Sequence, residues 1–323
     1  MSFLVKLPAE RYSSTAFDGF VGSSDLELGD AKAMAWMCQL AYETDEPGKI
    51  KDILDAWGLS LVEDGIVVEE VDTALPKSST CGFVASGRGA TVVAFAGTDP
   101  VVLANWITNF DIHFQSTGAA RGYATAAAAV WPALRALLGT QAAGSKIIVT
   151  GHSLGGALAV LTAHQIGTET GRSVHAVYTF GTPRPGDATF AGTYNQRIGQ
   201  RTYRLVHGED LVPTVGPSFL KFRHVGRFLN CPRGGTFNTR DLTADTGSDE
   251  PEFVRGISNE LIGLLRGPLS QFLSPIDRLK LAASLTIGAK PAGMRTDPAG
   301  ILIELLSPRL RDHMPDRYIG ACG

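Results

Sequence analysis

A serine lies between two glycines at positions 151–155, where the sequence reads Gly-His-Ser-Leu-Gly. A β-branched run at 146–150 precedes this motif, and an Ala/Leu-rich run at 154–166 follows it. This order predicts a buried strand, a sharp turn and a helix, which together make a nucleophile elbow. The serine hydroxyl of an elbow stands clear of the sheet, and the glycines leave room for the crowded backbone. We therefore expect Ser153 to be the nucleophile of an acyl-transfer reaction.

A serine nucleophile needs a histidine to accept its proton and an acid to orient that histidine. In elbow hydrolases these groups follow in the chain order Ser, then Asp or Glu, then His. A strand predicted at 201–207 runs into Gly208-Glu-Asp-Leu-Val-Pro213. This order puts Asp210 just beyond the carboxyl end of a strand, where ligand sites of parallel sheets collect. We predict Asp210 as the acid, with Asp187 and Glu209 as the alternatives.

The base must follow the acid in the sequence, and two histidines, His224 and His313, do so. His224 has strand-like neighbours at 222–226, whereas His313 lies in the polar, proline-containing segment Arg311-Asp-His-Met-Pro-Asp-Arg-Tyr318. A terminal loop of this kind is able to reach the edge of the sheet. We predict His313 as the general base and keep His224 as the alternative.

The predicted strand at 90–96 ends on Gly97-Thr98. In elbow hydrolases the loop after an early strand supplies half of the oxyanion hole, and the N–H that follows the nucleophile supplies the other half. We predict an oxyanion hole made by Thr98, through its N–H and hydroxyl, and by the N–H of Leu154. A plain β-turn at 97–99 is the alternative explanation of Gly97-Thr98.

Apolar and aromatic side chains recur every four positions after this turn. They are Val102, Trp106, Phe110 and Phe114. The spacing predicts one apolar face of a helix beside the site. The segment 99–118 is a candidate lid that binds substrate and responds to lipid, and a core helix is the alternative.

The elements predicted around these residues alternate between strands and helices. Strands are expected at 65–71, 82–85, 90–96, 146–150, 175–180 and 201–207, and helices at 30–43, capped by Asp30, at 125–138 and at 154–166. This alternation predicts a mostly parallel central sheet flanked by helices, in a single domain over residues 1–323. At about 234–305 a loop leads into helical patterns at 252–273 and 276–287, which predicts a helical C-terminal insertion, either a packed face or a cap.

The composition excludes several classes of protein. The 323 residues are 44% hydrophobic with a formal net charge of −3 and contain no Lys/Arg-rich stripe, so no nucleic-acid partner is expected. No apolar stretch approaches the roughly 18 residues of a membrane-spanning helix. The segment Met1 to Pro8 lacks the basic region and apolar core of a signal peptide. We expect a cytoplasmic protein without a transmembrane segment, and export by a non-classical route stays open.

The cysteines are far apart in the sequence and lack the spacing of a metal site. They are Cys38, Cys81, Cys231 and Cys322. Reduced thiols are the favoured interpretation, and an oxidising compartment would allow three ways of pairing them. A Ser-His-Asp mechanism requires no metal ion and no organic cofactor, so we predict none.

These motifs together resemble the class 3 lipases, the fungal triacylglycerol lipase type of α/β-hydrolase. The similar blocks are Val92-Val-Ala-Phe-Ala-Gly-Thr98, Asn105-Trp106, Gly151-His-Ser-Leu-Gly-Gly156, Tyr178-Thr-Phe-Gly-Thr-Pro-Arg-Pro-Gly186, His207-Gly-Glu-Asp-Leu-Val-Pro213, and Asp312-His313 with Tyr318. The resemblance covers about residues 30–228 and the last dozen. It implies an α/β-hydrolase fold and the triad Ser153, Asp210 and His313, with Thr98 as the oxyanion residue.

Three positions depart from the family pattern. Ala96 replaces an arginine, Asn109 stands where an aspartate is common, and Ala120-Arg-Gly-Tyr123 lacks the usual histidine. In the family these positions support the lid and its hinge. The departures therefore concern the lid more than the triad.

The predicted function is hydrolysis of lipid esters through an acyl-enzyme, with triacylglycerol as the favoured substrate. Phospholipase A1 and short-chain esterase are the alternatives within this class. A non-catalytic lipase-fold protein that binds lipid or a partner is the alternative of another class, and an acyltransferase is a third. The sequence leaves acyl-chain preference and oligomeric state open.

Overall fold

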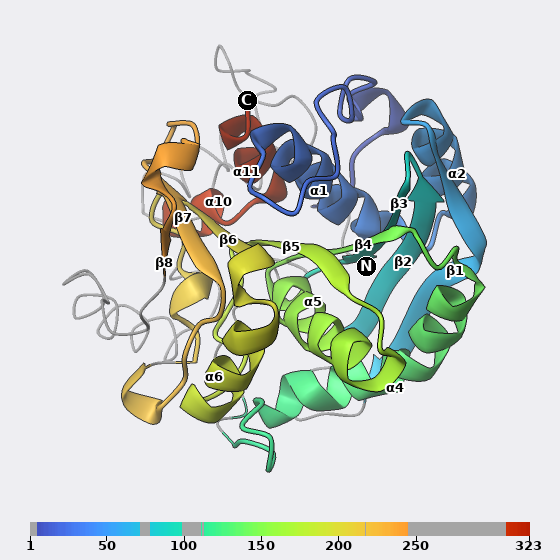
Figure 1. The fold of residues 1–323 in the computed structure, drawn as a ribbon. Coiled ribbons are helices and arrows are strands. Elements are labelled where there is room, and N and C mark those ends of the chain that lie inside the picture. The colour runs from blue at the N-terminus through green and yellow to red at the C-terminus, as the bar shows by residue number, and fades with distance from the viewer. Residues whose placement is uncertain (1–4, 72–77, 99–110, 112, 217, 245–307) are drawn as a thin grey trace, which may run out of the picture.

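The computed structural model describes residues 5–71, 78–98, 111, 113–216, 218–244 and 308–323 (Figure 1). Within these ranges, eight strands form one sheet whose spatial order follows the chain order. The strands are β1 (Leu59–Val71), β2 (Ser78–Gly87), β3 (Ala90–Phe95), β4 (Lys146–His152), β5 (Val174–Phe180), β6 (Thr202–His207), β7 (Arg227–Cys231) and β8 (Thr243–Ala244). Strands β3 to β7 are mutually parallel, and the pairs β1–β2, β2–β3 and β7–β8 are antiparallel. The prediction of a mostly parallel central sheet is confirmed.

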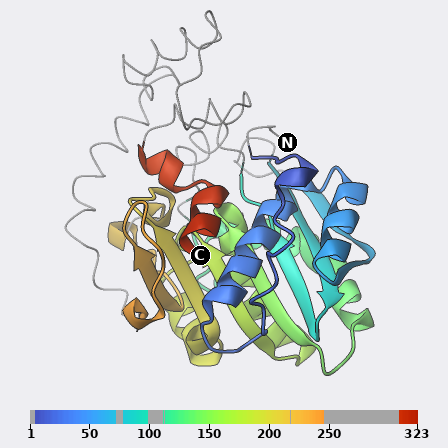
Figure 2. The same ribbon diagram turned by 90° about the horizontal axis from the view of Figure 1, so that it is seen from above.

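Helices cover both faces of this sheet (Figures 1 and 2). On one face lie α1 (Leu28–Leu40) and α11 (Pro315–Ala321), which contact each other, and on the other lie α4 (Arg121–Thr140), α5 (Leu154–Gln165) and α6 (Ala188–Arg197). Two further helices are α2 (Pro47–Ala56) and α10 (Pro308–Asp312). Single-turn elements lie at Ala9–Arg11, Ala41–Glu43, Gly199–Arg201, Val212–Thr214, Ser218–Leu220 and Thr239–Asp241, with a π-helical turn at Ile166–Thr170.

The two covered faces hold two separate hydrophobic cores. Successive residues of a strand point to opposite faces, so Val92 and Ala94 of β3 enter the core under α1, whereas Val93 and Phe95 enter the core under α4 and α5. All six residues of β3 are buried. A strand covered on both faces reads as a continuous apolar run, which is why β3 to β5 were recognisable in the sequence.

Asp30 does not cap the first helix, and that prediction is wrong. Helix α1 begins at Leu28, so Asp30 lies in its first turn, where it is fully buried. Its carboxylate accepts hydrogen bonds from the backbone N–H groups of Val21, Gly22 and Ser23 at 2.7 to 3.0 Å. The aspartate thus holds the preceding loop against the helix instead of starting the helix.

Most of the candidate lid and insertion lies outside the described residues. This applies to Val102, Trp106 and Phe110 and to the helices predicted at 252–273 and 276–287. Phe114 is described and is not helical: it forms a β-bridge with Ala120, and its ring lies 4.5 Å from that of Phe222. The described start of the insertion, 234–244, was predicted as loop, and it holds a single 3-10 turn and the short edge strand β8.

None of the helices in the described ranges combines the length and the apolar character that crossing a bilayer requires. The four cysteines are buried free thiols. Burial raises the pKa of Cys38 to about 12 and that of Cys231 to about 11, so both thiols stay protonated at neutral pH. In the same ranges, no group of three or more His, Cys, Asp or Glu side chains is arranged to hold a metal ion.

Candidate active site

Ser153 occupies the turn between β4 and α5 with φ 57° and ψ −131°. Non-glycine residues rarely adopt a positive φ, so this backbone is held in a strained conformation by its surroundings. A β-carbon on Gly151 would overlap the backbone of Gly155, and one on Gly155 would overlap the backbone at the end of β3. Both glycines of the motif are therefore required by close backbone contact. The turn has the geometry of a nucleophile elbow.

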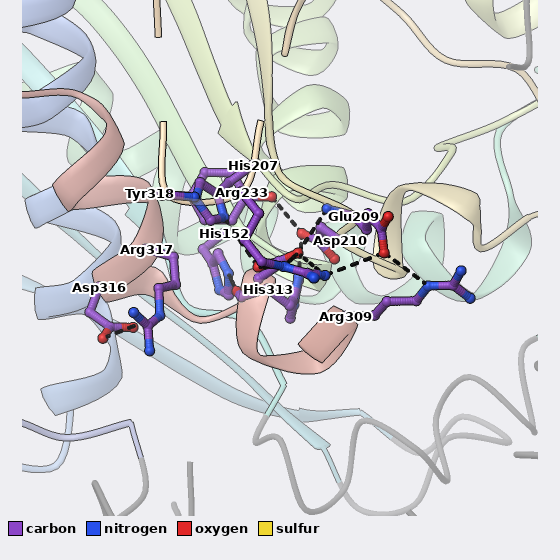
Figure 3. Close-up of polar contacts among 12 residues, drawn as sticks. His152, His207, Glu209, Asp210, Arg233, Arg309, His313, Asp316, Arg317 and Tyr318 are labelled. Atoms are coloured by element: carbon purple, nitrogen blue, oxygen red, sulfur yellow. Dashed lines mark hydrogen bonds and ion pairs between the residues drawn. The ribbon is translucent and has the colours of Figure 1, made fainter. Parts of the chain in front are cut away.

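Asp210 and His313 meet at the carboxyl end of β6 although 103 residues separate them in the sequence. His313 donates its Nδ1–H to Asp210 Oδ2 at 2.8 Å, and both side chains are buried (Figure 3). Tyr318 donates its hydroxyl to the same oxygen, and the N–H of Val212 donates to Asp210 Oδ1 at 2.9 Å. Because Nδ1 carries the hydrogen in this arrangement, Nε2 of His313 is left to accept a proton.

Two buried polar atoms beside this hydrogen-bond chain have no partner within the described part of the protein. They are Nε2 of His313 and Oγ of Ser153. The imidazole rings of His313 and His152, the residue before Ser153, have centroids 4.5 Å apart. Buried polar atoms are normally satisfied. A free hydroxyl and a free imidazole nitrogen in one buried region are the atoms that a proton-transfer site presents to its substrate.

His152 holds the backbone of the residue that carries this imidazole. Its Nε2–H donates to the carbonyl oxygen of His313 at 2.6 Å, and its Nδ1 accepts from the hydroxyl of Tyr42 at 2.8 Å. Burial lowers the pKa of His152 well below its usual range, and the neighbouring His313 lowers it further. His152 therefore stays neutral and donates one hydrogen bond while accepting another. Our sequence reasoning missed both Tyr42 and the role of His152.

Thr98 follows a glycine that packs directly on the elbow. A β-carbon at Gly97 would come within 2.6 Å of the β-carbon of Ser153, so only glycine permits this approach. The Thr98 hydroxyl is buried and lacks a hydrogen-bond partner among the residues that the structure describes. Leu154 is the first residue of α5, so its N–H has no acceptor within the helix. Potential donors thus flank Ser153 from two elements.

The alternatives for the acid have other partners. Asp187 caps α6, where its carboxylate accepts from the N–H groups of the helix at 2.9 and 3.0 Å. Glu209 is about half exposed and pairs with Arg233 at 3.3 Å and with Arg309 at 3.6 Å (Figure 3). Of the three carboxylates considered, Asp210 is the one that contacts a histidine imidazole through a hydrogen bond in the described structure.

The alternative base, His224, lies away from these groups. Its Nε2–H donates to the carbonyl oxygen of Pro213 at 2.9 Å. Burial lowers its pKa well below the usual range, and Arg204 and Arg184 lower it further. The expected strand around it begins only at Arg227. His224 thus serves as a neutral hydrogen-bond donor in the loop before β7.

The free energy of unfolding is expected to fall as the pH drops below about 6.5. Burial lowers the pKa of five histidines, His152, His164, His175, His207 and His224. These side chains protonate more readily in the unfolded chain, so acid favours unfolding, by up to about 1.4 kcal/mol per pH unit for each of the fully buried His152 and His224 and by less for the three partly buried histidines. Urea unfolding between pH 7.5 and 5.5 measures the slope. His224→Gln, which keeps a donor for Pro213, should make the slope shallower, and an unchanged slope would contradict the assignment.

The comparisons with known proteins agree with this geometry. Residues 92–219 match the family model described as lipase (class 3). The secreted mono- and diacylglycerol lipase LIP1 of Malassezia globosa is 39% identical over 84 residues, which cover 26% of this chain and 28% of the relative. The secreted mono- and diacylglycerol lipase 1 of Fusarium solani is 29% identical over 171 residues, covering 48% of this chain and 50% of the relative. The chain thus spans between a quarter and a half of the length of these relatives.

Solved structures extend the likeness of fold beyond the matched segments. Lipase II from Rhizopus niveus superimposes with a TM-score of 0.55 at 21% sequence identity, over 68% of this chain and 88% of that chain. The prediction of an α/β-hydrolase fold is confirmed by this similarity together with the eight-stranded sheet and its flanking helices.

The expectation of a cytoplasmic protein is contradicted by the same relatives. Those from Malassezia globosa and Fusarium solani are both named as secreted proteins, which points to an extracellular location. The expectation rested on the lack of a signal-peptide pattern in Met1 to Pro8 and of a long apolar stretch, and the names of these relatives overturn it. The matched range contains Thr98, Ser153 and Asp210, so the segment that carries these predicted site residues, 92–219, is similar to the class 3 lipases.

Proposed function

We propose that the protein is a lipase that hydrolyses lipid esters through an acyl-enzyme formed on Ser153. The observation that carries this proposal is the buried Asp210–His313 hydrogen bond, which leaves Nε2 of His313 available in the same region as the unpartnered hydroxyl of the elbow serine. A serine on an elbow, a histidine with a free nitrogen and an acid that orients it are the parts that ester hydrolysis requires.

The reaction follows from these positions in two half-reactions. Ser153 Oγ attacks the ester carbonyl carbon while His313 Nε2 takes the hydroxyl proton, and Asp210 stabilises the imidazolium that forms. The tetrahedral oxyanion accepts hydrogen bonds from Leu154 N–H and from Thr98. The carbonyl reforms as the alcohol leaves with the proton from His313. A water molecule then gives its proton to His313, attacks the acyl-enzyme and releases the fatty acid, and Ser153 recovers its proton.

Acylglycerols are the substrate class that we propose. The relatives from Malassezia globosa and Fusarium solani are named as mono- and diacylglycerol lipases. We therefore add these partial glycerides to the triacylglycerol that the sequence favoured. Initial rates should be compared for mono-, di- and triacylglycerols, a phosphatidylcholine and a short-chain p-nitrophenyl ester, each below and above its aggregation limit. Faster turnover of the acylglycerols supports the proposal. Preference for the phospholipid would indicate a phospholipase A1, preference for the short ester a plain esterase, and absence of any turnover a non-catalytic protein.

Removing the Thr98 hydroxyl tests the oxyanion assignment. We expect Thr98→Val to lower kcat by about 10²- to 10³-fold, because one preorganised donor to the oxyanion is lost while the backbone N–H stays in place. KM should change little, since the donor acts on charge that develops in the transition state. Thr98→Ser keeps the hydroxyl and should retain most of the activity. Equal kinetics for the valine and serine variants would show that the hydroxyl takes no part.

A further inference from the structure

The acid and the base of the proposed triad are joined by a second linkage, one residue earlier on each segment. Asp312 precedes His313, and Glu209 precedes Asp210. The backbone N–H of Glu209 donates to Asp312 Oδ2 at 2.8 Å, alongside the 2.8 Å bond between His313 and Asp210. We propose that Asp312 and Arg233 form a clasp that positions His313 for proton transfer. The proposal rests on the hydrolase function proposed above.

Arg233 completes the clasp from the connection that follows β7. Its Nε donates to both carboxylate oxygens of Asp312, at 3.0 and 2.9 Å, and its Nη2 lies 2.8 Å from Oδ2. The side chain of Asp312 is 4% exposed, whereas that of Arg233 is 46% exposed. A buried carboxylate needs such partners, because an unpaired charge in the interior is strongly destabilising. The guanidinium therefore fixes where the carboxylate, and with it the start of the His313 segment, can lie.

The end of β6 is shaped around this carboxylate. Gly208 has a φ of 58°, and a β-carbon there would overlap the carboxylate of Asp312. The N–H of Gly208 donates to the carbonyl oxygen of Cys231 at 2.9 Å, which ties the same turn to the strand that leads into Arg233. The glycine thus permits Asp312 to approach the turn that carries Asp210.

His207 faces the same carboxylate as a neutral imidazole. The N–H of Gly234 approaches His207 Nε2 at 3.4 Å, so Nδ1 carries the hydrogen and lies 3.7 Å from Asp312 Oδ1. Burial lowers the pKa of His207, although the charges of Asp312 and Asp210 oppose this shift. The imidazole is consequently neutral at neutral pH, and Arg233 supplies the positive charge that balances Asp312.

The residues around His313 need this external support because their own helices are short. Helix α10 has five residues and α11 has seven, and helices of this length are not stable by themselves. His152 holds the carbonyl of His313 from one side. The clasp holds Asp312, the residue before His313, from another side. The imidazole is therefore fixed between two independent contacts.

Kinetics per active site test the clasp separately from stability. The variants are Arg233→Gln, Arg233→Lys and Asp312→Asn, with Arg240→Gln as a matched control at an exposed arginine in the same connection. A fluorophosphonate titration gives the fraction of reactive enzyme, and kcat is divided by that fraction. For Arg233→Gln and Asp312→Asn we expect kcat per titrated site to fall about 10- to 100-fold with little change in KM, as a displaced catalytic group would cause.

The remaining variants show whether the two side chains act as one unit. Arg233→Lys keeps the charge but loses the planar fork, so its kcat should lie between those of wild type and Arg233→Gln. The double variant Arg233→Gln/Asp312→Asn should lose no more activity than the worse single variant, because both break the same linkage. If Asp312→Asn does not fold, the Arg233 variants decide, since that side chain is half exposed.

Two results would overturn the proposal in distinguishable ways. If Arg233→Gln lowers the melting temperature and the titrated fraction but keeps the kcat per site of Arg240→Gln, the ion pair only stabilises the fold and the clasp is rejected. If wild type itself neither hydrolyses esters nor reacts with the probe, the proposed function fails and the clasp falls with it. A hydrolysing wild type with an inactive Ser153→Ala variant shows that the function stands whatever the clasp variants do.

Discussion

His313→Ala is expected to lower kcat by at least about 10³-fold, and by up to about 10⁶-fold if the triad acts as a unit. The variant removes the nitrogen that we propose takes the proton of Ser153. Among the described residues, His313 is the histidine whose buried Nε2 lacks a hydrogen-bond partner. Stopped assays at several enzyme concentrations, with melting temperatures measured in parallel, give the turnover of folded protein. KM should change little because the imidazole acts on the reacting proton.

His224→Ala is the matched control for this prediction. His224 donates to the carbonyl of Pro213 and contacts no member of the proposed triad through a hydrogen bond in the described residues. Its loss should lower stability by about 1 kcal/mol, the usual effect of losing one hydrogen bond, and leave kcat near that of wild type. If His224→Ala abolished turnover while His313→Ala did not, the base would be assigned to the wrong histidine.

Asp210→Asn is expected to lower kcat by about 10⁴-fold. The carboxylate accepts from His313 Nδ1 at 2.8 Å and thereby leaves Nε2 free to accept a proton. An amide in its place is able to donate to Nδ1, which moves the hydrogen to Nε2 and blocks proton transfer from Ser153. Single-turnover measurements with a chromogenic ester should show slow acylation, because the impaired proton transfer from Ser153 occurs in the step that forms the acyl-enzyme.

The other two carboxylates provide matched controls for Asp210. Asp187→Asn keeps an efficient N-cap on α6, because asparagine and aspartate cap helices about equally well. Glu209→Gln removes a charge that is half exposed and pairs with arginines. Both variants should keep kcat near the wild-type value. A loss of about 10⁴-fold in either, with Asp210→Asn active, would transfer the acid role to that residue.

The parts of the fold that the sequence predicted well are those whose pattern has a local cause. Strands β3 to β6 are nearly continuous apolar or β-branched runs, and their predicted bounds differ from the observed ones by at most two residues. Strand β1 was expected only from residue 65, because its first half contains polar residues and passes an irregularity between Leu61 and Ile66. Helix α6 was missed because the apolar residues of Ala188–Arg197 are few and its cap, Asp187, was considered only as a catalytic acid.

The candidate site divides in the same way. Ser153 follows from a local motif, and Asp210 and His313 follow from the order that elbow hydrolases impose on the chain. Arg233 and Tyr42 could not be found by such rules. Arg233 contacts Asp312, 79 residues away, and Tyr42 contacts His152, 110 residues away. The spacing of residues in a single sequence does not indicate which distant segments pack together. These contacts become visible only when the sheet brings the segments to one edge.

Covalent labelling of Ser153 by a fluorophosphonate tests the central claim most directly, because the probe reacts fastest with a serine whose proton is removed by a correctly placed base. We expect one adduct per chain, located on Ser153 by peptide mass spectrometry, and loss of ester hydrolysis in proportion to labelling. Ser153→Ala should take up no label, and His313→Ala should label far more slowly than wild type. A folded wild-type protein that takes up no label, or carries it on another residue while Ser153 stays free, would contradict the account.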